Sequence, residues 1–241
     1  IYGLVERVAD HLSVPADGQP RQRLWRVYSQ CALLCAGATE RSIAFENNDR
    51  PGIMLAGSVR AYANRWATAV GDRIAIFTNN DDAYRTAHDL LKLGVEIAAV
   101  IDSRPEAPKS TSFEVLSASE VVNTHGRLGL NSIDVKTPQG LRQIQVSGLG
   151  VSGGWNPNIH LTCHQRGRPQ WDAALSAFIP SAELPEGLHV AGAANGQMTT
   201  AAAIDDAVKK AAKITKGFGR KPTMLTKLKI SDESTSITPF W

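Results

Sequence analysis

The segment from Arg73 to Arg104 constrains the fold more than any other part of the chain. An apolar run at Ile74–Phe77 predicts a buried parallel strand, and the polar turn after it opens a helix with one apolar face. Gly94 is placed to end that helix, and the apolar run Val95–Ile101 predicts the next strand. A strand, a helix and a strand in this order form the crossover unit of a dinucleotide-binding α/β fold.

The turn of this crossover contains no glycine. It reads Thr-Asn-Asn-Asp-Asp, whereas a bound pyrophosphate needs unobstructed backbone N–H groups and glycines that let it come close. Asp81 and Asp82 suit the positive end of the helix dipole, by about 0.3–1 kcal/mol each, but they would repel a phosphate. We therefore expect this unit to keep the fold without a dinucleotide. Asp102, at the position of a ribose-binding acid, is then an ordinary strand-end residue.

Composition is that of an ordinary globular protein. Of the 241 residues 43% are hydrophobic and 20% charged, and the net charge of +3 is too small to indicate nucleic-acid binding. No run reaches the ~18 apolar residues of a membrane span. The 3 cysteines provide no disulfide framework, which favours a reducing compartment, so we expect a cytoplasmic protein.

Three places share another local design, an apolar run that ends in a glycine-containing turn. The turns lie at Gly37, at Gly153–Gly154 and at Gly192–Gly196. Ligands of open α/β sheets bind at the carboxyl ends of strands, where glycine tolerates positive φ and lets backbone approach a ligand. A helix with Thr199 or Thr200 as its N-cap follows the third turn. Its N-terminus would suit a pyrophosphate, although a glycine that packs strand against helix explains the pattern equally well.

The crossover lies between the first and second glycine turns, which indicates one nucleotide-fold domain inserted into another. We predict an outer domain of residues 1–50 and 148–216 and an inserted domain of residues 51–147, with hairpin-linked strands after its crossover. Residues 217–241 are expected to form a tail or linker. Because the chain opens on Ile1 as if already inside a fold, we expect a fragment.

Two sharper chemical interpretations fit the sequence poorly. Gly150–Gly154 matches the G-x-S-x-G nucleophile elbow, but Pro157 opposes the helix that must follow the serine. His160, Cys163 and His164 could share a helix face, yet zinc usually takes a further protein ligand and none lies nearby in the sequence. We therefore predict neither a catalytic residue nor a metal site in this chain.

Four stretches together resemble the α subunits of heterotetrameric sarcosine oxidases and the related subunits of opine oxidases and hydrogen cyanide synthase. They are Ala36–Met54, Thr78–Leu90, Val151–Leu161 and His189–Gly196. The resemblance implies the α/β fold of the pyridine nucleotide–disulfide oxidoreductases, with two Rossmann-like, FAD/NAD(P)-binding domains, one inserted into the other. It also implies incompleteness at the N-terminus, because the family's first strand and phosphate loop would precede Ile1.

The same resemblance implies a function. In that family this region is similar to one that binds NAD tightly, while FAD in the β subunit oxidises the amine and FMN at the subunit interface passes electrons to oxygen. We expect the NAD-binding portion of the α subunit of a sarcosine oxidase-like amine oxidase, which converts sarcosine to glycine by oxidative demethylation, to be inactive alone and to assemble with other subunits. Alternatives are a piece of an NAD(P)H-dependent flavin oxidoreductase, or a non-catalytic scaffold with a vestigial site.

The resemblance also carries over the cofactor-facing turns. These residues are Gly37, Ala38, Thr39, Glu40, Gly153, Gly154, Trp155, Gly192, Ala193, Ala194, Asn195 and Gly196. In flavoprotein relatives the last turn is similar to a Gly-Asp pair whose carboxylate binds the ribitol of FAD. Because this turn lacks an Asp, we expect NAD rather than FAD in the outer domain, in a site completed by the missing N-terminal segment.

Overall fold

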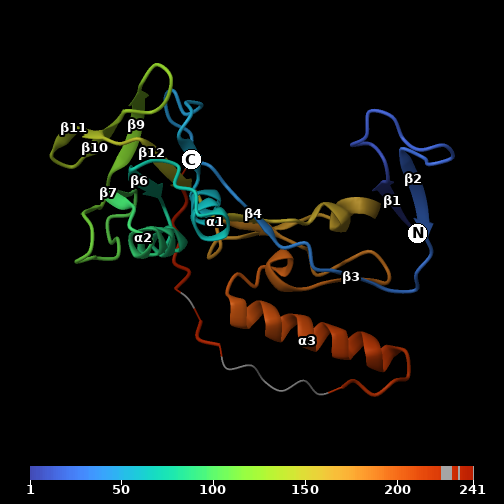
Figure 1. The fold of residues 1–241 in the computed structure, drawn as a ribbon. Coiled ribbons are helices and arrows are strands. Elements are labelled where there is room, and N and C mark those ends of the chain that lie inside the picture. Colours follow the sequence, from blue (N-terminus) through green and yellow to red (C-terminus); the bar gives the residue numbers. More distant parts are fainter. Residues whose placement is uncertain (224–229, 233, 241) are drawn as a thin grey trace.

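A five-stranded parallel sheet forms the centre of the region that we predicted to be an inserted domain, and the name inserted domain is kept for this region (Figure 1). The computed structural model describes residues 1–223, 230–232 and 234–240. The strands lie in the order β5, β12, β6, β7, β8, and every pairing is parallel. Their bounds are β5 Ile53–Leu55, β6 Arg73–Thr78, β7 Glu96–Asp102, β8 Val115–Leu116 and β12 Gly148–Ser152.

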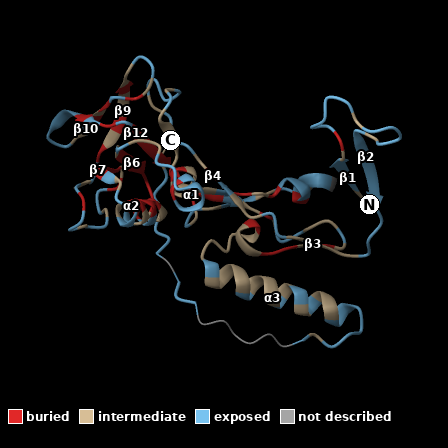
Figure 2. Cartoon of the chain, in the orientation of Figure 1, coloured by how far each residue is buried: buried red, intermediate tan, exposed pale blue. Residues whose placement is uncertain are grey.

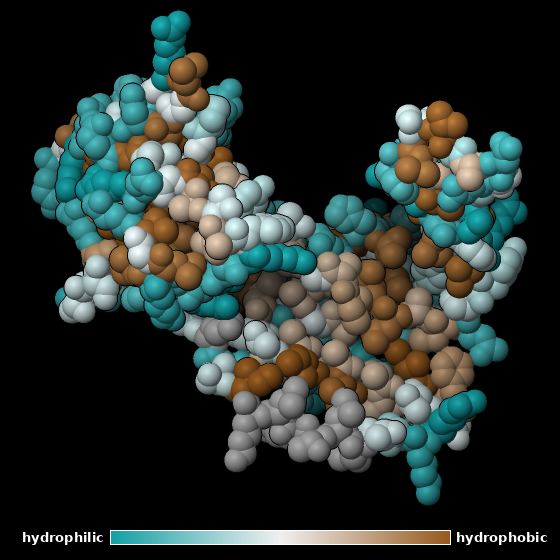
Figure 3. Space-filling model, in the orientation of Figure 1, coloured by the Kyte–Doolittle hydropathy of each residue, from teal (hydrophilic) through white to brown (hydrophobic). Residues whose placement is uncertain are grey.

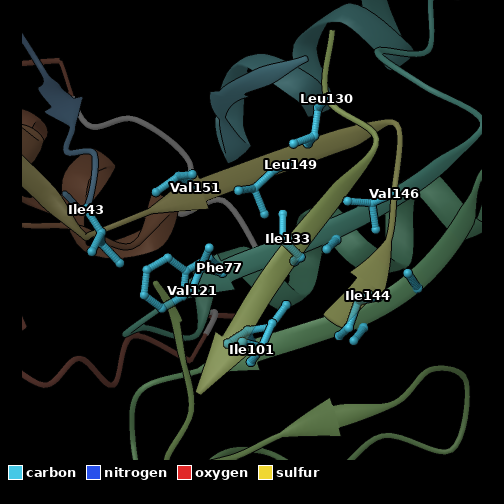
Figure 4. Close-up of a cluster of buried hydrophobic side chains, with 14 residues drawn as sticks. Ile43, Phe77, Ile101, Val121, Leu130, Ile133, Ile144, Val146, Leu149 and Val151 are labelled. Carbon is cyan, nitrogen blue, oxygen red and sulfur yellow. The ribbon is translucent and has the colours of Figure 1, made fainter. Parts of the chain in front are cut away.

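Different layers cover the two faces of this sheet. Helices α1 (Ala56–Trp66) and α2 (Asp82–Lys92) cover one face, where they pack on Ile74 and Ile76. An antiparallel layer covers the other face, where it packs on Phe77 (Figure 4). Its strands are β9 Glu120–His125, β10 Ser132–Thr137 and β11 Gly140–Gln145. The continuous apolar run of β6 therefore reflects burial on both faces.

The predicted crossover is confirmed. Strand β6 contains the apolar run, α2 begins at the predicted turn, and β7 contains the second run. Gly94 follows the last turn of α2 with a φ of 82°, a conformation that glycine adopts without strain. The hairpin-linked strands expected after the crossover are β9 to β11.

Strand β12 pairs across the predicted domain boundary. Residues 148–152, which we assigned to the outer domain, pair with both β5 and β6 inside the inserted domain's sheet. Leu149 and Val151 are buried there, because a central strand of a parallel sheet is covered on both faces. The sheet therefore extends to Ser152, and the chain crosses to the outer region at the second glycine turn.

The outer region consists of small two-stranded sheets and one long helix. The paired strands are β1 Tyr2–Arg7 with β2 Gln22–Val27, β3 Ala32–Leu34 with β16 Leu188–Val190, β4 Ala38–Glu40 with β13 Trp155–Pro157, and β14 Gln170–Asp172 with β15 Ala177–Ile179. The helices are η1 His160–Arg166, η2 Gly192–Asn195 and α3 Thr200–Gly217. In the part of the chain that the structure describes, only β3 and β16 pair in parallel here. A second Rossmann-like domain thus stays a prediction.

Burial differs sharply between the two regions (Figure 2). Fully buried side chains gather in the inserted domain, whereas α3, described along its whole length, has none. The β1–β2 hairpin is also exposed, and Figure 3 shows apolar side chains over it. Among the helices that the structure describes, none is long and apolar enough to cross a membrane.

The last described residues return to the inserted domain, as Figure 1 shows for the segment that ends at C. Residues 234–240, which we call the strap, lie against the carboxyl end of β6, where Ile237 forms an antiparallel bridge with Asn80. The strap belongs to the predicted tail, so this part of the tail is docked rather than extended into solvent. The predicted tail also includes residues 224–229, 233 and 241, which lie outside the described residues.

Candidate functional site

The three glycine turns border one cavity of about 250 Å³ between the inserted domain and the outer region. Ala38 comes from the first turn, Gly154 and Trp155 from the second, and Ala193 from the third. The other lining residues come from α1, α2, α3, the strap and the loops beside them. They are Arg60, Asn80, Asp81, Asp82, Arg85, Leu175, Met198, Thr200, Ser234, Thr235, Ser236 and Ile237.

Antiparallel pairing of β4 with β13 brings the first two turns together. Glu40 lies opposite Trp155, and Ala38 lies opposite Pro157. Next to this pair Asn158 closes the first turn, because its Nδ2 donates to the carbonyl of Ala36 at 2.9 Å and its Oδ1 accepts from Thr39 Oγ1 at 2.9 Å. The hydroxyl of Thr39 is thus engaged by the protein itself.

Arg41, which sequence reasoning missed, braces the second turn. Its Nε donates to the carbonyl of Gly153 at 3.1 Å, and its Nη1 donates to the carbonyl of Ser176 at 2.6 Å. A guanidinium suits this place because its several N–H groups point in fixed directions and can hold two carbonyls at once. The arginine directly after the first turn was visible in the sequence, but its partners lie more than a hundred positions away.

Glycine is required at the second turn by the protein's own atoms. Gly154 has a φ of 96°, and a Cβ there would lie 2.7 Å from Nη2 of Arg41 and overlap the side chain of Ile237. A Cβ on Gly153 would lie 2.9 Å from the carbonyl oxygen of Ser42. Gly37 differs, since its φ is 69° and the space beside it is open. The close backbone approach that we expected for a cofactor is, at Gly154, an approach of the strap.

The third turn is held by a carboxylate from α3. Asp206 Oδ2 accepts from the backbone N–H of Gly192 at 3.0 Å and from Asn195 Nδ2 at 3.1 Å. Ala194 is fully buried, so it packs inside, whereas Ala193 faces the cavity. Asp206 was missed because it lies inside α3, outside the glycine turn that the sequence pattern identified. Its carboxylate holds the turn against α3 through these two hydrogen bonds.

Helix α3 begins as predicted. Thr199 is its N-cap, with extended backbone, and its Oγ1 accepts from the N–H of Ala202 at 3.2 Å. Thr200, at the first helical position, lines the cavity. The N-terminus of a long helix therefore lies beside the cavity, in an orientation that favours a negatively charged ligand group.

Glu40 is a buried acid at the N-terminus of α1. Its Oε2 accepts from the N–H of Gly57 at 2.8 Å, and only 8% of the residue is exposed. Burial raises the pKa of Glu40 to about 7, although hydrogen bonds from Ser152 and Gly57 favour the charged form. Glu40 was predicted as a cofactor-facing residue. The structure joins it to the inserted domain's first helix.

The crossover turn does not place its carboxylates as we expected. Asn80 Oδ1, rather than Asp81, accepts from the first N–H of α2, at 3.1 Å from the nitrogen of Asp82. Asp81 instead binds Arg104 Nη1 at 2.7 Å, and Arg104 also binds Asp102 at 2.7 Å. The carboxylate of Asp81 is therefore not free, because Arg104 neutralises part of the charge that it and Asp102 carry.

Asp102 is more than an ordinary strand-end residue. It is fully buried, and it accepts from the hydroxyl of Tyr84 at 2.8 Å as well as from Arg104. Burial raises the pKa of Tyr84, and the neighbouring charge of Asp102 raises it further. A buried carboxylate engaged in this way has no free oxygen edge for a ribose.

The structure places the residues of the nucleophile-elbow pattern differently from an elbow. Ser152 is fully buried at the end of β12, and its Oγ accepts from Asn80 Nδ2 at 3.1 Å. A strand, β13, follows it rather than a helix. Within residues 1–223, 230–232 and 234–240, no group of three or more potential metal-ligating side chains occurs.

Comparison with solved structures identifies the fold. The chain has an α/β fold resembling the FAD/NAD(P)-binding domains of thioredoxin reductase. Lactococcus lactis thioredoxin reductase matches with a TM-score of 0.60 at 14% identity, over 90% of this chain and 74% of that one. L-proline dehydrogenase from P. horikoshii matches with a TM-score of 0.62 at 19% identity, over 79% of this chain and 35% of that one. At such identities the likeness concerns the fold alone.

The sequence relatives are more specific. The chain is homologous to the α subunit of sarcosine oxidase, which confirms the predicted resemblance. It is 38% identical over 245 residues to this subunit from Rhizobium meliloti (strain 1021), and 37% identical over 214 residues to that from Corynebacterium sp. (strain U-96). The matches cover 100% and 83% of this chain but only 25% and 22% of those subunits. No family model matches.

Proposed function

We propose that this chain is the NAD-binding portion of the α subunit of a sarcosine oxidase-like amine oxidase. In this proposal the complex demethylates sarcosine to glycine at flavin sites in, or shared with, partner subunits. This chain then contributes a cofactor site and part of the scaffold, and it performs no chemistry alone. Homology over the whole chain supports the oxidoreductase family, and the finer assignments rest on the cavity.

The observation that carries the proposal is that all three predicted turns border the same cavity. The first turn is separated from the other two by more than a hundred residues of sequence, yet Ala38, Trp155 and Ala193 line one space. At about 250 Å³ this space lies just below the ~300–1,000 Å³ of typical ligand sites. We therefore propose that it receives one end of NAD, and that the rest extends along the outer domain.

The lining residues fit a nucleotide end. Trp155 and Met198 offer apolar surface to a flat ring. Arg60 and Arg85 both line the cavity and both pair with the carboxylate of Asp82, at 3.9 and 3.2 Å, so this side of the cavity presents guanidinium groups, which are suited to a phosphate. When bound, NAD supplies a ring that can accept a hydride.

The exposed β1–β2 hairpin supports assembly with other subunits. Leu24 and Trp25 are 67% and 51% exposed on opposite faces of the hairpin, and the residues paired with them, Val5 and Leu4, are 63% and 51% exposed. Figure 3 shows apolar side chains over this hairpin. Exposed apolar surface that gathers in this way marks interaction sites. Together with homology to a subunit, it is consistent with a place in a hetero-oligomeric oxidase.

The test is to identify the nucleotide that the intact protein retains. The full-length subunit would be purified with its partner subunits, denatured, and its released nucleotides quantified by mass spectrometry. We expect close to one NAD per α subunit, and we expect Trp155→Ala to lose most of it. Trp66→Ala is the matched control, because Trp66 is 56% exposed on α1 and does not line the cavity.

Other results would select the alternatives. FAD without NAD would overturn the cofactor assignment. No retained nucleotide in either the wild type or the control would favour a scaffold with a vestigial site. Reduction of bound flavin by added NAD(P)H would favour the flavin oxidoreductase. Equal loss of NAD in the Trp155→Ala and Trp66→Ala variants would show that the cavity is not the NAD site.

A further inference from the structure

We infer that the carboxyl edge of the inserted domain's parallel sheet is a peptide-binding surface, and that its ligand is the strap. In open α/β sheets this edge is where dinucleotides bind. Here residues 234–240 of the same chain take that place. The inference is independent of which cofactor occupies the cavity, because it rests on contacts between the strap and the crossover turn, although residues 234–237 also border the cavity.

The strap binds this edge through its backbone, as an added strand does. The carbonyl of Ser236 accepts from the N–H of Asp81 at 3.0 Å, and the N–H of Thr238 donates to the carbonyl of Asn79 at 3.1 Å. The side chain of Asn79 adds a bond from its Nδ2 to the carbonyl of Thr238 at 2.8 Å. The asparagines that replace glycine in the turn thus hold a peptide.

Electrostatics also favours a peptide over a phosphate at this edge. Asp81 and Asp102 share one cation, Arg104, and the side chains of Arg104 and Asp81 are only 5% and 9% exposed. This buried cluster carries an excess negative charge, so it attracts hydrogen-bond donors and repels anions. The strap supplies those donors, because the N–H of Ser236 lies 3.0 Å from Asp81 Oδ2 and the hydroxyl of Ser234 binds the same oxygen.

Two apolar side chains anchor the strap. Ile237 sits directly over Gly154, where any larger residue would overlap it. Phe240 packs edge-on against Phe77, with ring centroids 5.9 Å apart, and joins the core between the sheet and its antiparallel layer. Side-chain pockets at alternate positions give such peptide surfaces their specificity.

Hydrogen exchange of the full-length protein tests this inference. In the wild type we expect protected amides at Asp81, Ser236 and Thr238, because each donates within the strap contact. Ile237→Asp should speed exchange at these amides about tenfold or more while leaving the β6 amides protected, which shows that the fold is intact. Ser231→Asp is the matched control, since it adds the same charge at an exposed position outside the strap.

A synthetic peptide of residues 232–240 provides the second measurement. Added to the Ile237→Asp protein, it should restore protection at Asp81, and a peptide with the same Asp substitution should not. NADH and NADPH should leave Asp81 unprotected in that protein. The inference is wrong if wild-type Asp81 exchanges at the unprotected rate, if both peptides act alike, or if a nucleotide displaces the strap. Should Ile237→Asp unfold β6, Phe240→Ala takes its place in each comparison.

Discussion

A single buried carboxylate, Glu40, joins the first glycine turn to the inserted domain. It lies at the N-terminus of α1, where the N–H of Gly57 and the helix dipole both favour its charged form. Burial opposes them and dominates, which raises its pKa to about 7. The cost of this buried charge makes the junction between the two regions sensitive to pH near neutrality.

Glu40→Gln should therefore change the pH dependence of stability. A carboxyl whose pKa is raised from 4.5 to about 7 contributes stability below 4.5 that is lost as pH rises toward 7. Relative to the wild type, the Gln variant should gain on the order of 1–3 kcal/mol in unfolding free energy between pH 5 and pH 8. Urea unfolding of both proteins at each pH measures this difference in unfolding free energy. Glu46→Gln, at an exposed acid on the same segment, should give parallel curves.

Alanine substitutions at Gly154 and Gly94 distinguish the energetic cost of backbone strain from the cost of steric overlap. Both have positive φ, 96° and 82°, but a Cβ would meet neighbours only at Gly154. Gly94→Ala should cost about 1 kcal/mol through strain, and Gly154→Ala should cost about 1–3 kcal/mol more through overlap with Ile237. Equal losses of unfolding free energy in urea would contradict the packing of the strap on this glycine.

At the scale of the element, α3 depends on specific polar contacts more than on burial. None of its residues is fully buried, although its N-cap and the carboxylate of Asp206 are well placed. Tertiary packing usually supplies most of the stability of a helix in a protein. Here, within the described residues, the link between the third turn and α3 rests on hydrogen bonds to Asp206.

Two neighbouring aspartates provide a matched test of that link. Asp206→Ala removes the acceptor for Gly192 and Asn195 and should cost about 1.5–3 kcal/mol, because hydrogen bonds to a charged group are lost. Asp205→Ala removes only a surface ion pair with Lys209, at 2.5 Å, and should cost less than about 1 kcal/mol. Thermal unfolding of both variants measures the two losses of stability. A smaller loss for Asp206→Ala than for Asp205→Ala would refute the role assigned to Asp206.

At the scale of the whole molecule, the cavity and the strap share a boundary. Residues 234–237 both line the cavity and bind the crossover turn, so the two regions and the C-terminal segment meet at one place. A ligand in the cavity would contact all three. Ligand binding to the native state alone raises stability by mass action.

Removal of the nucleotide should accordingly destabilise the intact protein. If the proposed NAD site is correct, stripping NAD should lower the unfolding midpoint by several degrees, since a ligand at 100 times its Kd contributes about 2.7 kcal/mol. Re-addition of NAD should restore the midpoint, and NADPH at the same concentration should restore less. The measurement is differential scanning calorimetry of the purified complex. No change on stripping would contradict a site in this chain.

Local features of the molecule were predictable from sequence. The crossover, the end of α2 at Gly94, the start of α3 at Thr199 and the positive φ of Gly37 all depend on residues within a few positions of one another. The partners of Glu40, Arg41 and Asp81 were not predictable. Each is joined to a residue elsewhere in the chain, and no local pattern records which buried donor will meet which acceptor.

The sequence by itself determined the strands and helix of the crossover and the start of α3, because apolar periodicity and capping residues act over one or two turns of chain. The resemblance to sarcosine oxidase α subunits was also visible in the sequence alone. Only the tertiary structure decided that β12 completes the inserted sheet, that three distant turns line one cavity, and that the strap fills the dinucleotide edge. These are pairings across long loops, selected by burial and charge after the local elements exist.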